Sequence, residues 1–308
     1  MVPDVLERFE ILASGLDHPE GVAWWPAGRL LAGGEAGQIY EIALDGAVSE
    51  RASTGGFVYG VTVDGGGNVY ACDYGNAGVQ RVDRRGHVTT YSTGTAERPM
   101  RVPNFAAFDD EANLYVTDSG EWGDDDGLVY RITADGQTLV WTESVPRFPN
   151  GCCLSLDGGS LLVVESRGRA IVRIPVEDDG SAGRPEPLVD LTGSQPDGVA
   201  LAADGTMFVG CYRPDRIYRV SPDGRDVEVV AEDPDGVVLN QPANVAFVGN
   251  ELDRLAVSSL GGWSLVVADV GMAGAPLRYP TVPEWGPDPL GHEGEGVVVG
   301  IDPHQLES

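Results

Sequence analysis

The chain has 308 residues, of which 42% are hydrophobic, and this is enough apolar material for a sizeable folded core. Its 48 acidic and 20 basic residues give a formal net charge of -28. Because so negative a surface repels phosphate backbones and anionic lipids, we expect neither a nucleic acid nor a membrane as a partner.

The sequence has no recognisable membrane span, targeting signal or C-x-x-C motif. No stretch approaches the roughly 18 apolar residues of a membrane span, and the first residues lack a basic segment followed by an apolar one. We therefore expect a soluble, cytoplasmic protein. As partners we expect a small-molecule substrate and, at most, other copies of the chain in a weak homo-oligomer; otherwise the protein is a monomer. The four cysteines show no C-x-x-C spacing and are predicted to be free thiols: Cys72, Cys152, Cys153 and Cys211.

Similar openings recur along the chain, each followed by the same pattern of short strands. In order they read "HPEGVAWW" from residue 18, "VYGVTV" from 58, "VPNFAAF" from 102, "FPNGCCLSLDG" from 148, "QPDGVALAADG" from 195 and "QPANVAF" from 241. A turn rich in Gly and Asp follows, then a second strand, a third strand of the type "IYRV" and a more variable fourth, for example at 88–93 and 227–232.

The repeat length predicts the fold. The anchor positions of these openings are separated by 39, 45, 46, 47 and 46 residues: Glu20, Tyr59, Asn104, Asn150, Asp197 and Ala243. Six units of this length predict an all-β, six-bladed β-propeller of four-stranded antiparallel blades. We expect one domain over 1–308, with repeats over about 16–270. The N-terminal "ERFEILA" is a candidate to close the ring by pairing with the last blade, and the extension over about 276–308 could cover one end.

Four of the anchors carry side-chain oxygens. Equivalent positions in successive blades surround the propeller axis, so Glu20, Asn104, Asn150 and Asp197 are predicted to converge there. Two carboxylates in a low-dielectric tunnel favour a bound cation, and an oxygen-only donor set suits Ca²⁺ or Mg²⁺ and tolerates Mn²⁺ or Zn²⁺. The alternative is that Asn and Asp precede strands because they favour turns. Tyr59 and Ala243 offer neither carboxylate nor amide, so we expect one side of the ring to be open.

The openings "HPEGVAWW", "VPNFAAF", "FPNGCCLSLDG" and "QPDGVALAADG" resemble those of the senescence marker protein/gluconolactonase/luciferin-regenerating enzyme family of six-bladed propellers. The resemblance implies one divalent metal, Ca²⁺ before the others, held by Glu20, Asn150 and Asp197, with Asn104 as a further ligand or a substrate contact. It also implies hydrolysis of a lactone or related ester, with the metal as Lewis acid and Asp197 as general base.

The third opening departs from the family pattern. Members that act on sugar acids often carry Arg two residues before the Asn and Asp directly after it, whereas here Arg101 lies three residues before and Phe105 follows. This difference, with Trp24 and Trp122 nearby in sequence, favours a more apolar or aromatic substrate. The predicted substrate contacts are Asn104, Arg101, Glu121, Tyr59 and Phe105.

Two other functions are compatible with the same sequence. The altered third opening permits a metal-dependent lyase, aldolase or isomerase at the same site. A non-catalytic, calcium-binding propeller is the other alternative, because a fold does not fix a function.

Overall fold

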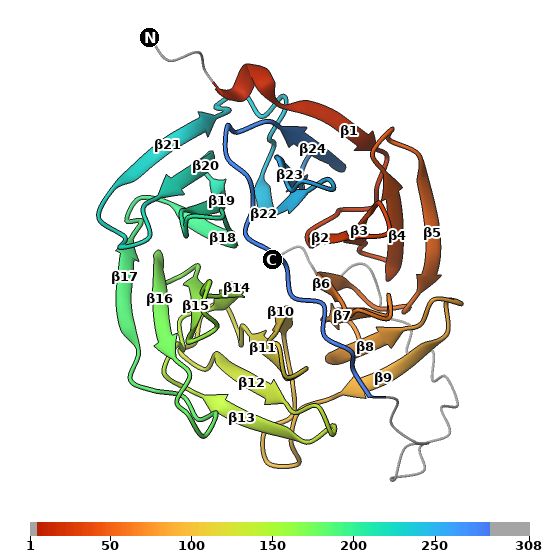
Figure 1. The fold of residues 1–308 in the computed structure, drawn as a ribbon, viewed down its shortest axis with the longest axis vertical. Coiled ribbons are helices and arrows are strands. Elements are labelled where there is room, and N and C mark those ends of the chain that lie inside the picture. Colours follow the sequence, from red (N-terminus) through yellow and green to blue (C-terminus); the bar gives the residue numbers. More distant parts are fainter. Residues whose placement is uncertain (1–4, 284–308) are drawn as a thin grey trace.

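The computed structural model describes residues 5–283, which form a closed ring of six four-stranded antiparallel sheets (Figure 1). The predicted six-bladed β-propeller is thereby confirmed. In blades one to five the strands pair in chain order. Blades one and two comprise β2 (Val22–Trp25), β3 (Arg29–Gly33), β4 (Gln38–Ala43), β5 (Val48–Ser53), β6 (Val58–Val63), β7 (Val69–Asp73), β8 (Gly78–Val82) and β9 (Val88–Ser92).

The next three blades repeat this meander. Their strands are β10 (Pro103–Phe108), β11 (Leu114–Asp118), β12 (Leu128–Ile132), β13 (Thr138–Thr142), β14 (Pro149–Leu154), β15 (Ser160–Glu165), β16 (Ala170–Pro175), β17 (Glu186–Asp190), β18 (Gln195–Leu201), β19 (Met207–Arg213), β20 (Asp215–Val220) and β21 (Val227–Glu232). The variable fourth strands expected at 88–93 and 227–232 correspond to β9 and β21.

Blade six joins the two ends of the described chain. It combines β22 (Pro242–Val248), β23 (Arg254–Ser259) and β24 (Ser264–Ala268) with β1 (Glu10–Ser14), which pairs antiparallel with β24. The expected closure by "ERFEILA" is therefore confirmed, and it covers an edge of β24 that would otherwise be unpaired. Within residues 5–283 the only helix is the 3-10 turn η1 (Val5–Arg8), and no helix there is long and apolar enough to span a membrane.

The hydrophobic core lies in layers between neighbouring blades. Tyr70 of blade two meets Phe108 of blade three edge to face, with ring centroids 4.9 Å apart. Phe208 of blade five meets Phe247 of blade six in the same way at 5.5 Å. Because each blade packs between two neighbours, its second strand is buried along its whole length, as in β7 and β11.

Side-chain caps set the turns between first and second strands. Asp109 accepts hydrogen bonds from the backbone N–H of Glu111 and Asn113, and from Nδ2 of Asn113 at 2.7 Å. Asp64 and Asn68 make the equivalent contacts in blade two. The Asp and Asn residues of these turns are therefore structural, because they satisfy backbone donors that the hairpin leaves free.

Each inner strand from β6 to β22 carries a bulge near its start. In β14, Pro149 pairs with Glu165 and Cys152 pairs with Val163, so two residues of β14 face one residue of β15. Similar register shifts occur in β6, β10, β18 and β22. A bulge redirects a side chain out of the strand's regular alternation, and here it falls at the anchor positions.

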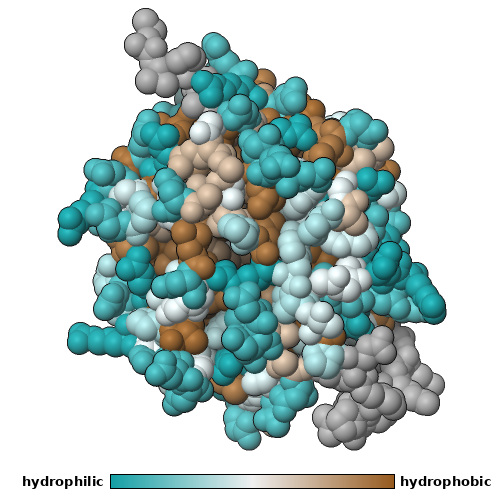
Figure 2. All heavy atoms as spheres, in the orientation of Figure 1, coloured by the Kyte–Doolittle hydropathy of each residue, from teal (hydrophilic) through white to brown (hydrophobic). Residues whose placement is uncertain are grey.

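The chain after β24 crosses one face of the ring toward β9 (Figure 1). We call residues 274–280 the strap. Tyr279 donates a hydrogen bond to the carbonyl oxygen of Trp24 at 2.6 Å, and Arg278 donates to the carbonyl oxygens of Ser155 and Leu156. Figure 2 shows hydrophobic residues near the centre of this face, beside the strap. The expected extension over 276–308 begins in the strap, and its residues 284–308 lie outside the described part.

Candidate functional site

Five buried polar side chains lie at the starts of five inner strands. We call them the oxygen ring: Glu20, Asn104, Asn150, Asp197 and Asn244, each no more than 8% exposed. Four of the five are the residues that the sequence predicted. The fifth, Asn244, was missed.

Asp197 is the centre of the contacts that link these side chains. Nδ2 of Asn244 donates a hydrogen bond to Oδ1 of Asp197 at 3.4 Å. Asn150 donates to the same carboxylate from the other side, and the negative charge of Asp197 acts on the carboxyl of Glu20. Side chains from blades one, four, five and six thus meet in the middle of the ring.

The amide side chains present oxygens that have no donor. The Oδ1 atoms of Asn104, Asn150 and Asn244 are buried, and no hydrogen-bond partner is found for them among the described residues. Nδ2 of Asn150 donates a hydrogen bond to the hydroxyl of Ser166 at 3.2 Å, so the nitrogen of this amide is engaged while its oxygen has no partner. Buried acceptors without a partner are costly, and oxygen donors of this kind are the ligands of hard divalent cations. The residues therefore fit such an ion.

The carboxyl groups of the ring are difficult to ionise without an added positive charge. Burial raises the pKa of Asp197 to about 7, although the hydrogen bond from Asn150 offsets part of the shift. Burial, and then the charge of Asp197, raise the pKa of Glu20 well above its usual value. Within residues 5–283 no three His, Cys, Asp or Glu side chains cluster as a metal site, so the ring relies on mixed carboxylate and amide donors.

At three positions of the oxygen ring a hydroxyl group from the preceding blade holds the backbone. Thr117 donates to the carbonyl oxygen of Asn150 at 2.7 Å, and Ser258 donates to the carbonyl oxygen of Glu20. Ser166 donates to the carbonyl oxygen of Pro196, next to Asp197, at 2.7 Å. These residues end or follow second strands, and sequence analysis gave them no role.

Glycine after an anchor permits neighbouring inner strands to approach each other. A Cβ on Gly198 would lie 2.3 Å from Oδ1 of Asn244 and 2.7 Å from its Cα. A Cβ on Gly151 would lie 2.6 Å from Cα of Gly198. The glycine of these openings is thus required by close packing of backbones around the axis.

The sequence alignment was wrong for blade six. It placed Ala243 at the anchor and left that side of the ring open, whereas Asn244 supplies a buried amide there. Ala243 and Asn244 are the two bulged residues of β22, opposite Ser258 of β23. Asn244 is the only amide within one residue of Ala243, and this is the sequence signal that could have identified it.

We call the end of the ring at which the inner strands begin the mouth, and Tyr59, the second residue of β6, lies at this end. Burial raises the pKa of its phenol, and the negative charges of Glu20 and Asp197 add to the shift. The ring of Tyr59 stacks on that of Tyr74, with centroids 5.3 Å apart and planes inclined by 7°. The structure therefore brings this predicted contact next to the two carboxylates.

Phe105 lies farther along the axis. It borders a cavity of about 550 Å³ whose walls are formed by inner-strand residues that follow the anchors and by the strap. Trp24 also lines this cavity and is buried, with its carbonyl bonded to the strap, so it lies away from the mouth. Trp122, by contrast, is exposed and packs edge to face on Phe148 at 4.7 Å.

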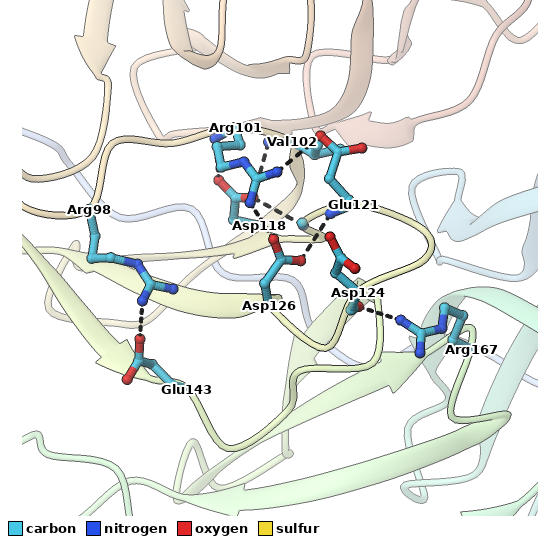
Figure 3. Close-up of polar contacts among 10 residues, drawn as sticks. Arg98, Arg101, Val102, Asp118, Glu121, Asp124, Asp126, Glu143 and Arg167 are labelled. Atoms are coloured by element: carbon cyan, nitrogen blue, oxygen red, sulfur yellow. Dashed lines mark hydrogen bonds and ion pairs between the residues drawn. The ribbon is translucent and has the colours of Figure 1, made fainter.

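Arg101 and Glu121 form an ion pair with each other (Figure 3). Arg101 also pairs with Asp126, and its backbone N–H donates to Asp118 at 2.7 Å. In the same loop region Arg167 pairs with Asp125 at 2.7 Å. Both guanidinium groups are thus engaged by acidic side chains of the loop between β11 and β12.

Comparisons with known proteins agree with the fold. The model of the SMP-30/Gluconolactonase/LRE-like region matches residues 88–261. The protein strictosidine synthase-like 3 of Arabidopsis thaliana is 27% identical over an alignment of 162 positions, and the match covers 48% of this chain and 41% of that protein, so the chain spans less than half of this relative.

Two solved structures have the same architecture. A gluconolactonase from Xanthomonas campestris superposes with a TM-score of 0.73 at 20% identity, covering 85% of this chain and 89% of its own. The calcium-binding protein regucalcin from Agrobacterium tumefaciens superposes with a TM-score of 0.75 at 18% identity, covering 89% and 97%. At these identities the two structures show a shared fold.

Proposed function

Because the chain belongs to the SMP-30/gluconolactonase/LRE-like family, we propose that it is a hydrolase that opens a lactone or related ester at the oxygen ring. The observation that carries this proposal is the convergence of two buried carboxylates with three amide oxygens that have no donor. Such a set holds a divalent cation, Ca²⁺ before Mg²⁺, Mn²⁺ or Zn²⁺, through Glu20, Asn150, Asp197 and Asn244, with Asn104 as a further ligand or substrate contact.

When bound, the cation supplies a positive charge that polarises the substrate carbonyl and stabilises its developing oxyanion. Asp197 orients a water molecule and accepts its proton as the water oxygen attacks the carbonyl carbon. The C–O bond of the ester then breaks, and the proton passes to the departing oxygen, giving a carboxylic acid and an alcohol. Tyr59, beside both carboxylates, forms the wall against which the substrate lies.

The test is release of acid from a panel of lactones, followed by the fall in pH. We expect turnover in the presence of a divalent cation, loss of turnover after chelation, and recovery when the ion is restored. Asp197→Asn should lower kcat by about 100-fold or more while the fold is retained, because general-base catalysis contributes about 10² to 10⁴. Asp178→Asn changes an exposed residue and is the matched control. Undiminished hydrolysis by the chelated protein would contradict the proposal.

A second candidate is a calcium-binding propeller without turnover. The large share of neutral amide donors favours it, because binding an ion needs no base, and the structural neighbour regucalcin is described as calcium-binding. This candidate predicts that calcium raises the melting temperature while every lactone on the panel is left intact.

A further inference from the structure

Three aromatic side chains line the mouth on the side of blade two. We call Phe57, Tyr59 and Tyr74 the aromatic wall. Phe57 meets Tyr59 edge to face at 4.7 Å, and Tyr59 stacks on Tyr74 at 5.3 Å. Tyr74 is 43% exposed. The aromatic wall therefore combines the packed ring of Tyr59 with the accessible ring of Tyr74.

The wall lies directly beside the oxygen ring. Tyr59 occupies the blade-two anchor position, and its carbonyl oxygen would lie 2.5 Å from a Cβ on Gly21, the residue after Glu20. His18, two residues before Glu20, packs against Phe57 with centroids 5.8 Å apart. A ligand whose reacting group reaches the carboxylates therefore has its remaining atoms next to these rings.

A second aromatic group borders the carboxylates from blade five. Tyr212, near the end of β19, is half-buried, and the charges of Asp197 and Glu20 add to the effect of burial in raising the pKa of its phenol. The charges of both carboxylates thus act on Tyr59 and on Tyr212. A flat group that reaches the carboxylates from this side therefore has tyrosine rings beside it.

The loop between β11 and β12 gives the mouth its charge. Its acidic side chains pair with Arg101 and Arg167, and these guanidinium groups already have carboxylate partners (Figure 3). An anionic substrate would have to displace those partners, and it would also approach a chain of net charge -28. An uncharged substrate avoids both costs.

We propose that the aromatic wall binds a planar, uncharged ring, so that the substrates are lactones or esters bearing an aromatic group, in preference to sugar lactones. This inference rests on the proposed hydrolase function for its chemistry, but the binding of the ring does not. Aromatic stacking is geometrically specific and favours a flat π-face over a saturated ring of similar size.

The kinetic test compares 3,4-dihydrocoumarin, δ-valerolactone and D-glucono-δ-lactone with the cation-loaded protein. We expect kcat/KM to be at least about 10-fold higher for dihydrocoumarin than for the other two. Tyr74→Leu should lower the preference for dihydrocoumarin by about 5- to 10-fold. Tyr74→Phe should retain the preference, because Phe keeps the aromatic ring. Trp263→Leu removes an exposed ring of blade six and should leave the preference unchanged.

A binding test separates this inference from the hydrolase proposal. The probe is 2-tetralone, a ketone shaped like dihydrocoumarin that cannot be hydrolysed, compared with cyclohexanone by saturation-transfer NMR. If no lactone is consumed but 2-tetralone binds preferentially and Tyr74→Leu abolishes the preference, the hydrolase proposal fails and the wall is supported. If sugar lactones are preferred, or Tyr74→Leu changes neither readout, the inference is overturned while lactone turnover keeps the hydrolase proposal. Absence of both turnover and 2-tetralone binding overturns both.

Discussion

Replacing Asp197 by Asn should change how the stability of the chelated protein depends on pH. Burial raises the pKa of Asp197 in the folded chain from 3.8 to about 7. Between these two pH values the folded state therefore binds a proton that the unfolded state has lost. The free energy of unfolding contributed by this group is fully present below about pH 4 and is lost as the pH rises through about 7.

The size of the effect follows from the shift. A difference of about three pKa units corresponds to about 4 kcal/mol at 1.36 kcal/mol per unit, which is an upper value because Glu20 titrates together with Asp197. Asn cannot ionise, so in Asp197→Asn this component of the pH dependence is absent. Repulsion among the many other carboxylates acts on both proteins and cancels in the comparison.

The assay is urea unfolding in chelator at pH 4.5, 6.0 and 7.5, followed by tryptophan fluorescence and circular dichroism. We expect the wild-type protein to lose more stability than Asp197→Asn across this range, by a few kcal/mol. Asp178→Asn is the matched control and should follow the wild-type curve. Parallel curves for the wild type and Asp197→Asn would refute the conclusion that this carboxyl is buried without a compensating charge.

Three further substitutions test the surroundings of the oxygen ring. Gly198→Ala should lower the free energy of unfolding by about 1 to 3 kcal/mol because its methyl group would overlap the blade-six amide, whereas Gly123→Ala has open space and should be neutral in the same denaturation assay. Thr117→Val leaves the carbonyl of Asn150 without its donor, and calorimetry should show a loss of about 1 to 3 kcal/mol together with weaker calcium binding. Tyr279→Phe should speed hydrogen exchange in the strap with little change in calcium affinity; unchanged exchange would contradict its role as a tether.

The architecture was predictable because turns close in sequence and a regular repeat length determine it. Gly and Asp turns set the hairpins, and a period of 39 to 47 residues sets the number of blades. Even the closing strand β1 could be anticipated, since an open ring would expose the edge of β24.

The residues of the oxygen ring were predictable only in those openings where the polar residue occupies the same position after the proline. Glu20, Asn104, Asn150 and Asp197 directly follow a proline, but in blade six the polar residue is one position later. The bulge in β22 contains both Ala243 and Asn244, and sequence spacing does not determine which of them presents the side chain.

The hydrogen bonds between blades could not be predicted from the sequence. Thr117 donates to a carbonyl 33 residues away and Ser258 to one 238 residues away, and neither separation has a local signature. The pairing of Arg101 with Glu121 and Asp126 likewise depends on how the loop after β11 folds back.

The proposed function depends on one divalent cation bound by side chains of blades one, four, five and six. Calcium titration of the chelated protein by isothermal calorimetry tests it most directly, using wild type, Asn244→Ala and the exposed control Asn250→Ala. The account predicts one ion per chain, with affinity at least about 10-fold weaker in Asn244→Ala, equivalent to about 1.4 kcal/mol, and unchanged in the control. No calcium binding by the wild type, or equal affinities in all three proteins, would contradict it.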